Sequence, residues 1–497
     1  MDNSPRIVSI HILDDDSLLH VFYHYRPFLL GEDKKVQVRL WGGNVRWDGG
    51  RWWYKLAHVC KRWRNILLGS ASYLELCLVC TYGTPVADML EHSPRLPLVI
   101  EYRYLDMTAE DEEGAILALK HRDRVRRIRF QVPAASLQKL IVAMDEEYPI
   151  LEYLIVLPQV DDNSSVPIFP ETLQAPRLRQ LTLRGFSLPI GSRLLTSAVS
   201  LITLSLLMVN PSVPSTYFHP STLLQWISFM PQLETLSIYF KLSIPDHDVQ
   251  SQFTHTPIVA PVTLPNLRHF QFRGDRSYLE AFVHPISSLP RLEKLVINFF
   301  EKLTLSIPPV LRSIKPSHNL TFDTAEFIFF DKKVGGAVYP RAVEKYNLSI
   351  IVYCRQLGRQ LSSMTQISES LSPMLSAVEL LTFEHEEHSQ LSEEHNEADR
   401  IEWRNLLRPF GNVKTLRIDN GLVKNLSRCL ASDDGELSSE LLPELREIIY
   451  SGSRDNGKAF TSFLDARENA GRHIILVRRD FVARANNALR SHPLKLS

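Results

Sequence analysis

Apolar residues recur in a fixed pattern over most of the chain. Six segments share the pattern Pro-x-Leu-x-x-apolar-x-apolar, and their first leucines are Leu151, Leu178, Leu233, Leu267, Leu292 and Leu445. Weaker copies without the proline begin at Val125, Leu201, Leu348, Val378 and Val413. Composition alone would give on the order of one full match, so the pattern indicates a repeat with steps of about 23 to 35 residues.

Each copy predicts a short strand whose alternate side chains face inward, while the proline ends the preceding helix. Helix-compatible pieces lie between the strands, for example at 221–230 and 278–283. One unit cannot close its own core, so neighbouring units must stack. The expected fold class is therefore α/β, an irregular solenoid in which parallel strands form a horseshoe and helices lie on its convex side. The concave side would offer an extended surface to a protein.

The N-terminal part of the chain has a different pattern. Three acidic residues precede a stripe of Leu18, Leu19 and Phe22, which predicts a short amphipathic helix that begins near Asp14. A second helix is predicted over 56–67, where apolar residues recur at steps of three and four. Two short helices cannot bury enough surface alone, so we expect their apolar stripe to stay partly uncovered and to meet a partner.

These helices resemble the F-box, whose pattern is Leu-Pro-x-Glu-Leu-Leu-x-x-Ile-Phe followed later by Val-Cys-Lys-x-Trp. The matching residues are Leu13, Asp16, Leu18, Val21, Phe22, Val59, Cys60, Lys61 and Trp63. The chain departs from the pattern at Asp14, where the family has Pro, and at Ser17, where it has Leu or Ile. A long insertion also separates the two halves, which affects the expected docking geometry.

The resemblance implies a substrate-recognition adaptor of a Skp-cullin-F-box ubiquitin ligase. The F-box would bind the Skp-type adaptor, which bridges to a cullin and a RING subunit, and the repeats would bind an unidentified target protein. The implied docking residues are Leu13, Leu18, Val21, Phe22, Val59, Cys60 and Trp63, although several must also serve the core of the domain. The patterns along the chain predict the organisation into domains: an F-box-like region over 1–72, atypical leading units over 73–130, and the repeats over 131–497 with an acidic loop near 384–400 and a C-terminal cap.

The insertion over 31–53 concentrates four of the seven tryptophans, Trp41, Trp47, Trp52 and Trp53, among glycines. Similar stretches occur in F-box-like proteins of basidiomycete fungi. One interpretation is a loop whose tryptophans pack back on the helices. The other is a partner-binding loop, because Trp and Arg dominate interface hot spots.

Composition and charge narrow the function further. Lys plus Arg equals Asp plus Glu at 56 each, so no net field steers the chain toward nucleic acid or anionic lipid. The first twenty residues lack an apolar signal core and the five cysteines are odd in number, which favours the cytoplasm or nucleus with reduced thiols. Phosphate-cradle and hydrolase motifs do not occur in the sequence, so we expect no catalysis and no cofactor.

Three segments could carry chemistry, and each also has a structural interpretation. Cys77 and Cys80 form a lone Cys-x-x-Cys without further metal ligands at suitable spacing, and the histidines near 385–395 lack the His-Glu-x-x-His spacing. The basic run 120–129 could bind phosphates, yet its apolar residues keep strand register.

Two alternatives to the adaptor remain: a plain repeat scaffold capped by the F-box-like helices and, less favoured at zero net charge, a nucleic-acid-associated repeat protein.

Overall fold

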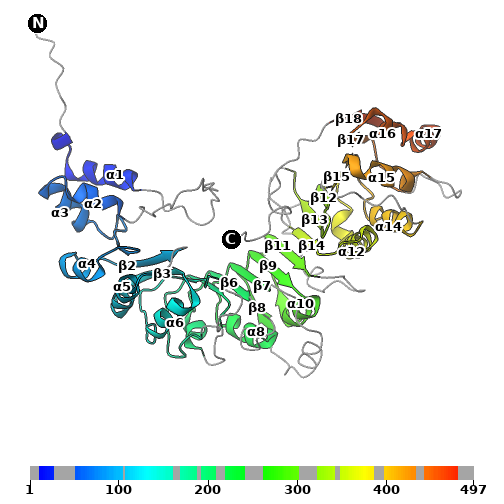
Figure 1. Cartoon of the computed structure of the whole chain (residues 1–497). Coiled ribbons are helices and arrows are strands. Elements are labelled where there is room, and N and C mark those ends of the chain that lie inside the picture. Colours follow the sequence, from blue (N-terminus) through cyan, green and yellow to red (C-terminus); the bar gives the residue numbers. More distant parts are fainter. Residues whose placement is uncertain are drawn as a thin grey trace, which may run out of the picture. The chain divides into compact units, whose positions relative to one another are not determined.

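The computed structural model describes residues 10–26, 51–103, 107–159, 168–186, 192–208, 219–240, 261–300, 322–341, 348–385, 397–431 and 441–479. The chain divides into two compact units. Figure 1 labels their helices and strands. Unit 1 comprises 1–181 and 191–198, and unit 2 comprises 182–190 and 199–497. Both are mixed α/β structures dominated by parallel strands, and each is described by itself below.

Unit 1 begins with helices and continues as alternating strands and helices. The N-terminal helices are η1 (Ile10–Ile12), α1 (Asp15–Tyr25), α2 (Trp52–Ala57) and α3 (Lys61–Gly69). The remaining elements are β1 (Leu78–Cys80), α4 (Val86–His92), β2 (Leu98–Arg103), α5 (Ala109–Lys120), β3 (Val125–Gln131), α6 (Ala134–Val142), β4 (Tyr153–Val156) and α7 (Arg193–Ser197), with β5 (Gln180–Arg184) across the division. Strands β1 to β4 pair in parallel and in sequence order.

Unit 2 repeats the same theme over a longer stretch. Its first half contains β6 (Thr203–Met208), α8 (Pro220–Ser228), β7 (Thr235–Phe240), β8 (Val262–Thr263), β9 (His269–Gly274), α10 (Arg276–Val283), β10 (Ile286–Ser288) and β11 (Lys294–Phe299). Its second half contains β12 (Thr324–Phe329), β13 (Val334–Tyr339), β14 (Leu348–Val352), α12 (Leu357–Ser370), α13 (Ser372–Leu375), β15 (Leu380–His385), α14 (Glu397–Leu407), β16 (Thr415–Ile418), η4 (Asn420–Leu422), α15 (Val423–Leu430), β17 (Glu447–Tyr450), α16 (Arg454–Lys458), α17 (Thr461–Asn469) and β18 (Ile475–Arg478).

The repeat pattern predicted the strand positions well. Every predicted copy from Val125 to Leu445 lies on or directly before a strand. The second and third apolar residues face the helices except in the copy at Leu348, where the register places Ile351 beside Asn298 on the opposite face and turns Ile350 and Val352 toward the helices. In β7, for example, Leu236 and Ile238 are fully buried, as are Leu416 and Ile418 in β16. At about 25 cal/mol per Å² of apolar surface, this ladder of leucines supplies most of the stability of the fold.

The expectation of uniformly parallel strands is wrong in the middle of unit 2. Strands β12, β13 and β14 form an antiparallel meander, and the sheet order there is β11-β14-β13-β12-β15. The hairpin between β12 and β13 turns at Asp331 and Lys332, with the Phe330 amide donating to the Lys333 carbonyl at 2.9 Å. The meander is inserted in reverse, so its last strand pairs in parallel with β11 and its first strand pairs in parallel with β15.

Aromatic side chains join the meander to the helices that cover it. The Phe327 ring of β12 stacks on that of Phe383 at 5.4 Å between centroids and meets the Phe410 ring edge-on at 6.0 Å. The Phe329 ring lies 5.5 Å from that of Trp403 in α14, which is 1% exposed. The meander therefore shares one core with the flanking repeats.

Alternate strand positions point away from the helices and carry polar side chains. In β7, β9 and β11 these positions include Ser237, Tyr239, Gln271, Arg273 and Asn298, which the strand register places side by side. We call this side of the unit 2 sheet the polar face. It is the side on which a stacked-repeat protein can present an extended surface.

Candidate partner-docking site

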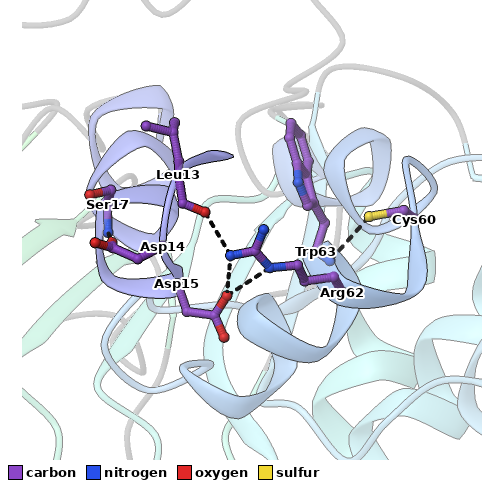
Figure 2. A network of polar contacts seen from close by, with 7 residues as sticks. All are labelled: Leu13, Asp14, Asp15, Ser17, Cys60, Arg62 and Trp63. Carbon is purple, nitrogen blue, oxygen red and sulfur yellow. Dashed lines mark hydrogen bonds and ion pairs between the residues drawn. The ribbon is translucent and has the colours of Figure 1, made fainter. Parts of the chain in front are cut away.

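The first helix begins where the sequence predicted. Asp14 is its N-cap, with extended backbone, and its carboxylate accepts a hydrogen bond from the Ser17 amide at 2.6 Å (Figure 2). That hydrogen bond lowers the pKa of Asp14, because it favours the charged carboxylate. The departure from the family proline at this position therefore provides a helix cap of the usual kind.

The second predicted helix is in fact two helices. The sequence predicted one element over 56–67, whereas α2 ends at Ala57 and α3 starts at Lys61. Cys60 interrupts the helix with extended backbone, and its Sγ accepts the Trp63 amide at 3.5 Å. A cysteine cap is not among the usual helix-start signals, so the sequence pattern did not show the break.

Arg62 ties α3 to the start of α1. Its guanidinium donates to an Asp15 carboxylate oxygen at 2.8 Å through Nε and to the Leu13 carbonyl at 2.7 Å through Nη2 (Figure 2). Both side chains are partly solvent-exposed, so the ion pair contributes on the order of 0.5 kcal/mol. Its main role is geometric, because it holds Leu13 beside the N-terminal end of α3.

The predicted docking residues divide into an interior set and an exposed set. Leu18, Phe22 and Trp63 are at most 8% exposed, and the Phe22 and Trp63 rings meet edge-on at 5.0 Å between centroids. Of the stripe that was expected to stay partly uncovered, Leu18 and Phe22 are therefore covered within unit 1, whereas Leu19 is half-buried. Cys60 is half-buried as the cap of α3.

Three of the predicted residues lie on the surface. Leu13, Val21 and Val59 are 37%, 46% and 55% exposed. Exposed large apolar side chains are concentrated in this part of the sequence: eight of the fourteen in the described part of the chain precede residue 74. These eight are Ile10, Ile12, Leu13, Val21, Tyr23, Tyr25, Val59 and Tyr73. Scattered exposed apolar residues are ordinary, so their concentration in this part of the chain makes α1–α3 the candidate for an interaction surface.

The tryptophan-rich insertion is described only at its end. Trp41 and Trp47 lie outside the described residues, whereas Trp52 and Trp53 belong to α2. Trp53 is 4% exposed, and its indole Nε1 donates to the Cys77 carbonyl at 3.1 Å. At this position the interpretation of a partner-binding loop is corrected, because the ring joins α2 to the chain that leads into β1.

The segments with possible chemistry have structural roles where they are described. Burial raises the pKa of Cys77 to about 11 and that of Cys80 to about 12, so both thiols are protonated and unreactive at neutral pH. The described residues contain no group of three His, Cys, Asp or Glu side chains that could hold a metal ion. His385 is the last residue of β15, where its backbone amide donates to the Asp419 carboxylate at 3.4 Å, and the remaining histidines of that segment lie outside the described residues.

The basic run is mostly engaged within unit 1. Arg122 pairs with Asp145 at 3.0 Å and also with Glu146, and Arg126 pairs with Glu152 at 3.0 Å. Arg127 stacks on the Tyr153 ring, with its guanidinium carbon 4.1 Å from the centroid. Arg122 and Arg126 therefore neutralise acids of the next repeat, and Arg127 packs on an aromatic ring of the next strand. All three arginines link neighbouring repeats.

The chain matches no family model and no curated protein. A structural likeness exists to the leucine-rich repeat-containing protein LegL7 from Legionella pneumophila, with 11% identity and a TM-score of 0.23 over 78% of this chain and 97% of that one. Within the described residues, no helix has both the length and the apolar character needed to cross a membrane.

Proposed function

We propose that this protein is a substrate-recognition adaptor of a Skp-cullin-F-box ubiquitin ligase. The α1–α3 helices would bind the Skp-type adaptor through Leu13, Val21 and Val59, and the stacked repeats would bind a target protein in the cytoplasm or nucleus. The observation that carries the proposal is the concentration of exposed apolar side chains on helices that resemble the F-box.

The residues that hold the three helices together differ from the apolar residues that the helices expose. Leu18, Phe22 and Trp63 already form a buried core, so the apolar side chains of Val21 and Val59 are not needed for folding. Removing exposed apolar surface from water is favourable by about 25 cal/mol per Å². A partner with a complementary apolar surface would therefore gain affinity mainly from these residues.

The mechanism would be proximity rather than chemistry in this chain. Binding energy would hold a target near a transfer reaction catalysed by other subunits, which makes that transfer effectively intramolecular. The polar face of unit 2 would provide the target-binding surface, because side chains of successive strands lie next to one another along it.

The deciding experiment compares valine-to-aspartate substitutions at exposed positions. Val21→Asp with Val59→Asp should weaken binding of a purified Skp-type adaptor to the full chain by tenfold or more, about 1.4 kcal/mol, since each buries a charge at the interface. Val142→Asp is the matched control, because Val142 is 61% exposed on α6. Binding should be measured by calorimetry and folding by circular dichroism.

The second candidate is a repeat scaffold that does not serve a ligase. It is favoured by the links between the helices and the following chain, such as the Trp53 hydrogen bond to Cys77 and the ion pair of Arg26 with Glu75 at 3.2 Å. These contacts suit an N-terminal cap of the repeats. A folded chain that fails to bind any Skp-type adaptor would favour the scaffold. Equal binding by the valine variants and the wild type would contradict the proposed docking residues.

A further inference from the structure

An arginine on the polar face of unit 2 has no carboxylate partner among the residues that the structure describes. Arg273 in β9 lies between Tyr239 of β7 and Asn298 of β11 in the strand register. Its guanidinium carbon is 5.3 Å from the Phe300 ring centroid and 5.4 Å from that of Tyr353. Among the described residues no acid pairs with it, and its buried Nε has no hydrogen-bond partner.

The two rings fix this guanidinium rather than neutralise it. Arginine stacks on aromatic faces, and the cation–π attraction holds the guanidinium in place without cancelling its charge. The flanking rings leave the edge of the guanidinium as its remaining hydrogen-bonding surface. That edge carries paired N–H donors in the geometry that a carboxylate matches.

Two neighbouring polar groups are buried and also lack partners. Asn298 and Ser349 are each 2% exposed, and neither the Asn298 Oδ1 nor the Ser349 Oγ has a hydrogen bond. Asn298 is the register neighbour of Arg273, and Ser349 lies on the adjoining strand β14. Buried polar groups are normally satisfied, so unsatisfied ones gathered beside an unpaired cation indicate a ligand rather than a folding requirement.

An apolar cluster borders these groups. Ile328, Phe330, Ala337 and Ile351 form a buried cluster on the meander, and Tyr339 and Tyr353 pack against it. Tyr353 therefore belongs both to this cluster and to the aromatic surround of Arg273. A ligand that pairs with the arginine would extend over apolar and tyrosine surface, which is typical of a protein segment at a hot spot.

We infer that this patch binds an aspartate or glutamate side chain of the target protein, with Arg273 as the carboxylate partner and Phe300 and Tyr353 as the side walls. Charge balance selects the carboxylate, because one guanidinium neutralises one carboxylate, whereas a phosphate dianion would remain half uncompensated in a partly desolvated place. The inference rests on the proposed target-binding role of the repeats and names the chemistry of that target.

The test uses a displayed library of short random peptides, selected on the full-length chain. Peptides that bind wild type should share an acidic residue, and replacing it by glutamine should weaken binding about tenfold or more. In Arg273→Gln the same replacement should have little further effect, so that the double-mutant cycle shows coupling between the two side chains. Arg446→Gln is the matched control, because that arginine is exposed at 71% of its side chain.

Other outcomes overturn the inference. Peptides without a common acid, equal binding by wild type and Arg273→Gln, or a preference for phosphoserine over glutamate at the coupled position would each contradict it. Arg273→Lys gives a second measure, since it keeps the charge but loses the paired donors and should also weaken binding. Skp-adaptor binding, measured on the same samples, separates this result from the proposed ligase role: a folded Arg273→Gln chain should retain it.

Discussion

Two buried amides in unit 2 should respond to removal with opposite signs. Asn298 is 2% exposed and its Oδ1 has no partner, whereas Gln360 is 3% exposed and its Nε2 donates to the Phe330 carbonyl at 2.7 Å and the Cys354 carbonyl at 2.9 Å. A buried polar group without a partner costs about 1–3 kcal/mol, and the same penalty applies to carbonyls that lose their donor. The fold therefore gains from removing one amide and loses from removing the other.

The magnitudes follow from these contacts. Asn298→Val removes the unsatisfied oxygen and adds a residue that favours strands, so we expect about 1 kcal/mol of added stability. Gln360→Leu removes the donor that ties the β12–β13 hairpin to α12, so we expect a loss of about 2 kcal/mol although leucine favours helices. The assay is urea-dependent hydrogen–deuterium exchange of peptides that cover β9, β11 and β14.

Equal destabilisation by both variants would refute this reasoning, because it would mean that Asn298 contributes to folding. Stabilisation by Asn298→Val together with weaker binding of acidic peptides would instead show a residue kept for function at a cost in stability. That combination separates a binding residue from a structural one on the same strand. Ser349→Ala extends the comparison to the other unsatisfied group, with a smaller gain expected.

Three further predictions concern unit 1. Because burial raises the pKa of Cys77 to about 11 and that of Cys80 to about 12, maleimide should label both thiols slowly in the native protein at neutral pH and quickly after unfolding. Trp53→Phe should lower the free energy of unfolding by about 1 kcal/mol through loss of the hydrogen bond to the Cys77 carbonyl, and Trp52→Phe should have a smaller effect in the same urea titration. Hydrogen bonds from Lys139 and Ser136 lower the pKa of Glu112 below its ordinary 4.5. The ionised carboxylate therefore stabilises the native state above pH 4.5, and this contribution disappears as the pH falls through the lowered pKa. Lys139→Gln with Ser136→Ala should flatten the acid side of the plot of unfolding free energy against pH.

The strand positions could be predicted because each strand carries its own local signal. The spacing of Leu233, Leu236 and Ile238 is enough to define β7, whichever strand pairs with it. Strands β12 and β13 lack the preceding proline, and Gly335 with Gly336 weakens the pattern in β13. The interval between the copies at Leu292 and Leu348 is long enough for two more strands. Its length is the signal that could have predicted them.

The docking site was predictable in composition but not in exposure. Leu18, Val21 and Phe22 lie within five positions of one helix, and the family pattern marks all three. Only Val21 is on the surface, because Leu18 is buried and Phe22 packs on Trp63, which lies on a helix that follows a long insertion. Which apolar residues are free to meet a partner depends on such long-range packing.

The reversed meander keeps Arg273 away from the acid of β12, and no other acid of the described segments pairs with it. Glu326 of β12 lies on the same face as Arg273, as the register through Ala337, Ser349 and Val296 shows. If the strands followed their order in the sequence, β12 would lie next to β11, two strands away from the β9 strand of Arg273. At about 4.8 Å per strand, Glu326 would then lie roughly 10 Å from that strand, within reach of two long side chains. The observed order places β14 and β13 in between, which doubles that separation to about 19 Å and brings Tyr353 beside the guanidinium instead. The inversion thus converts a place for an internal ion pair into one where the arginine remains available to a partner.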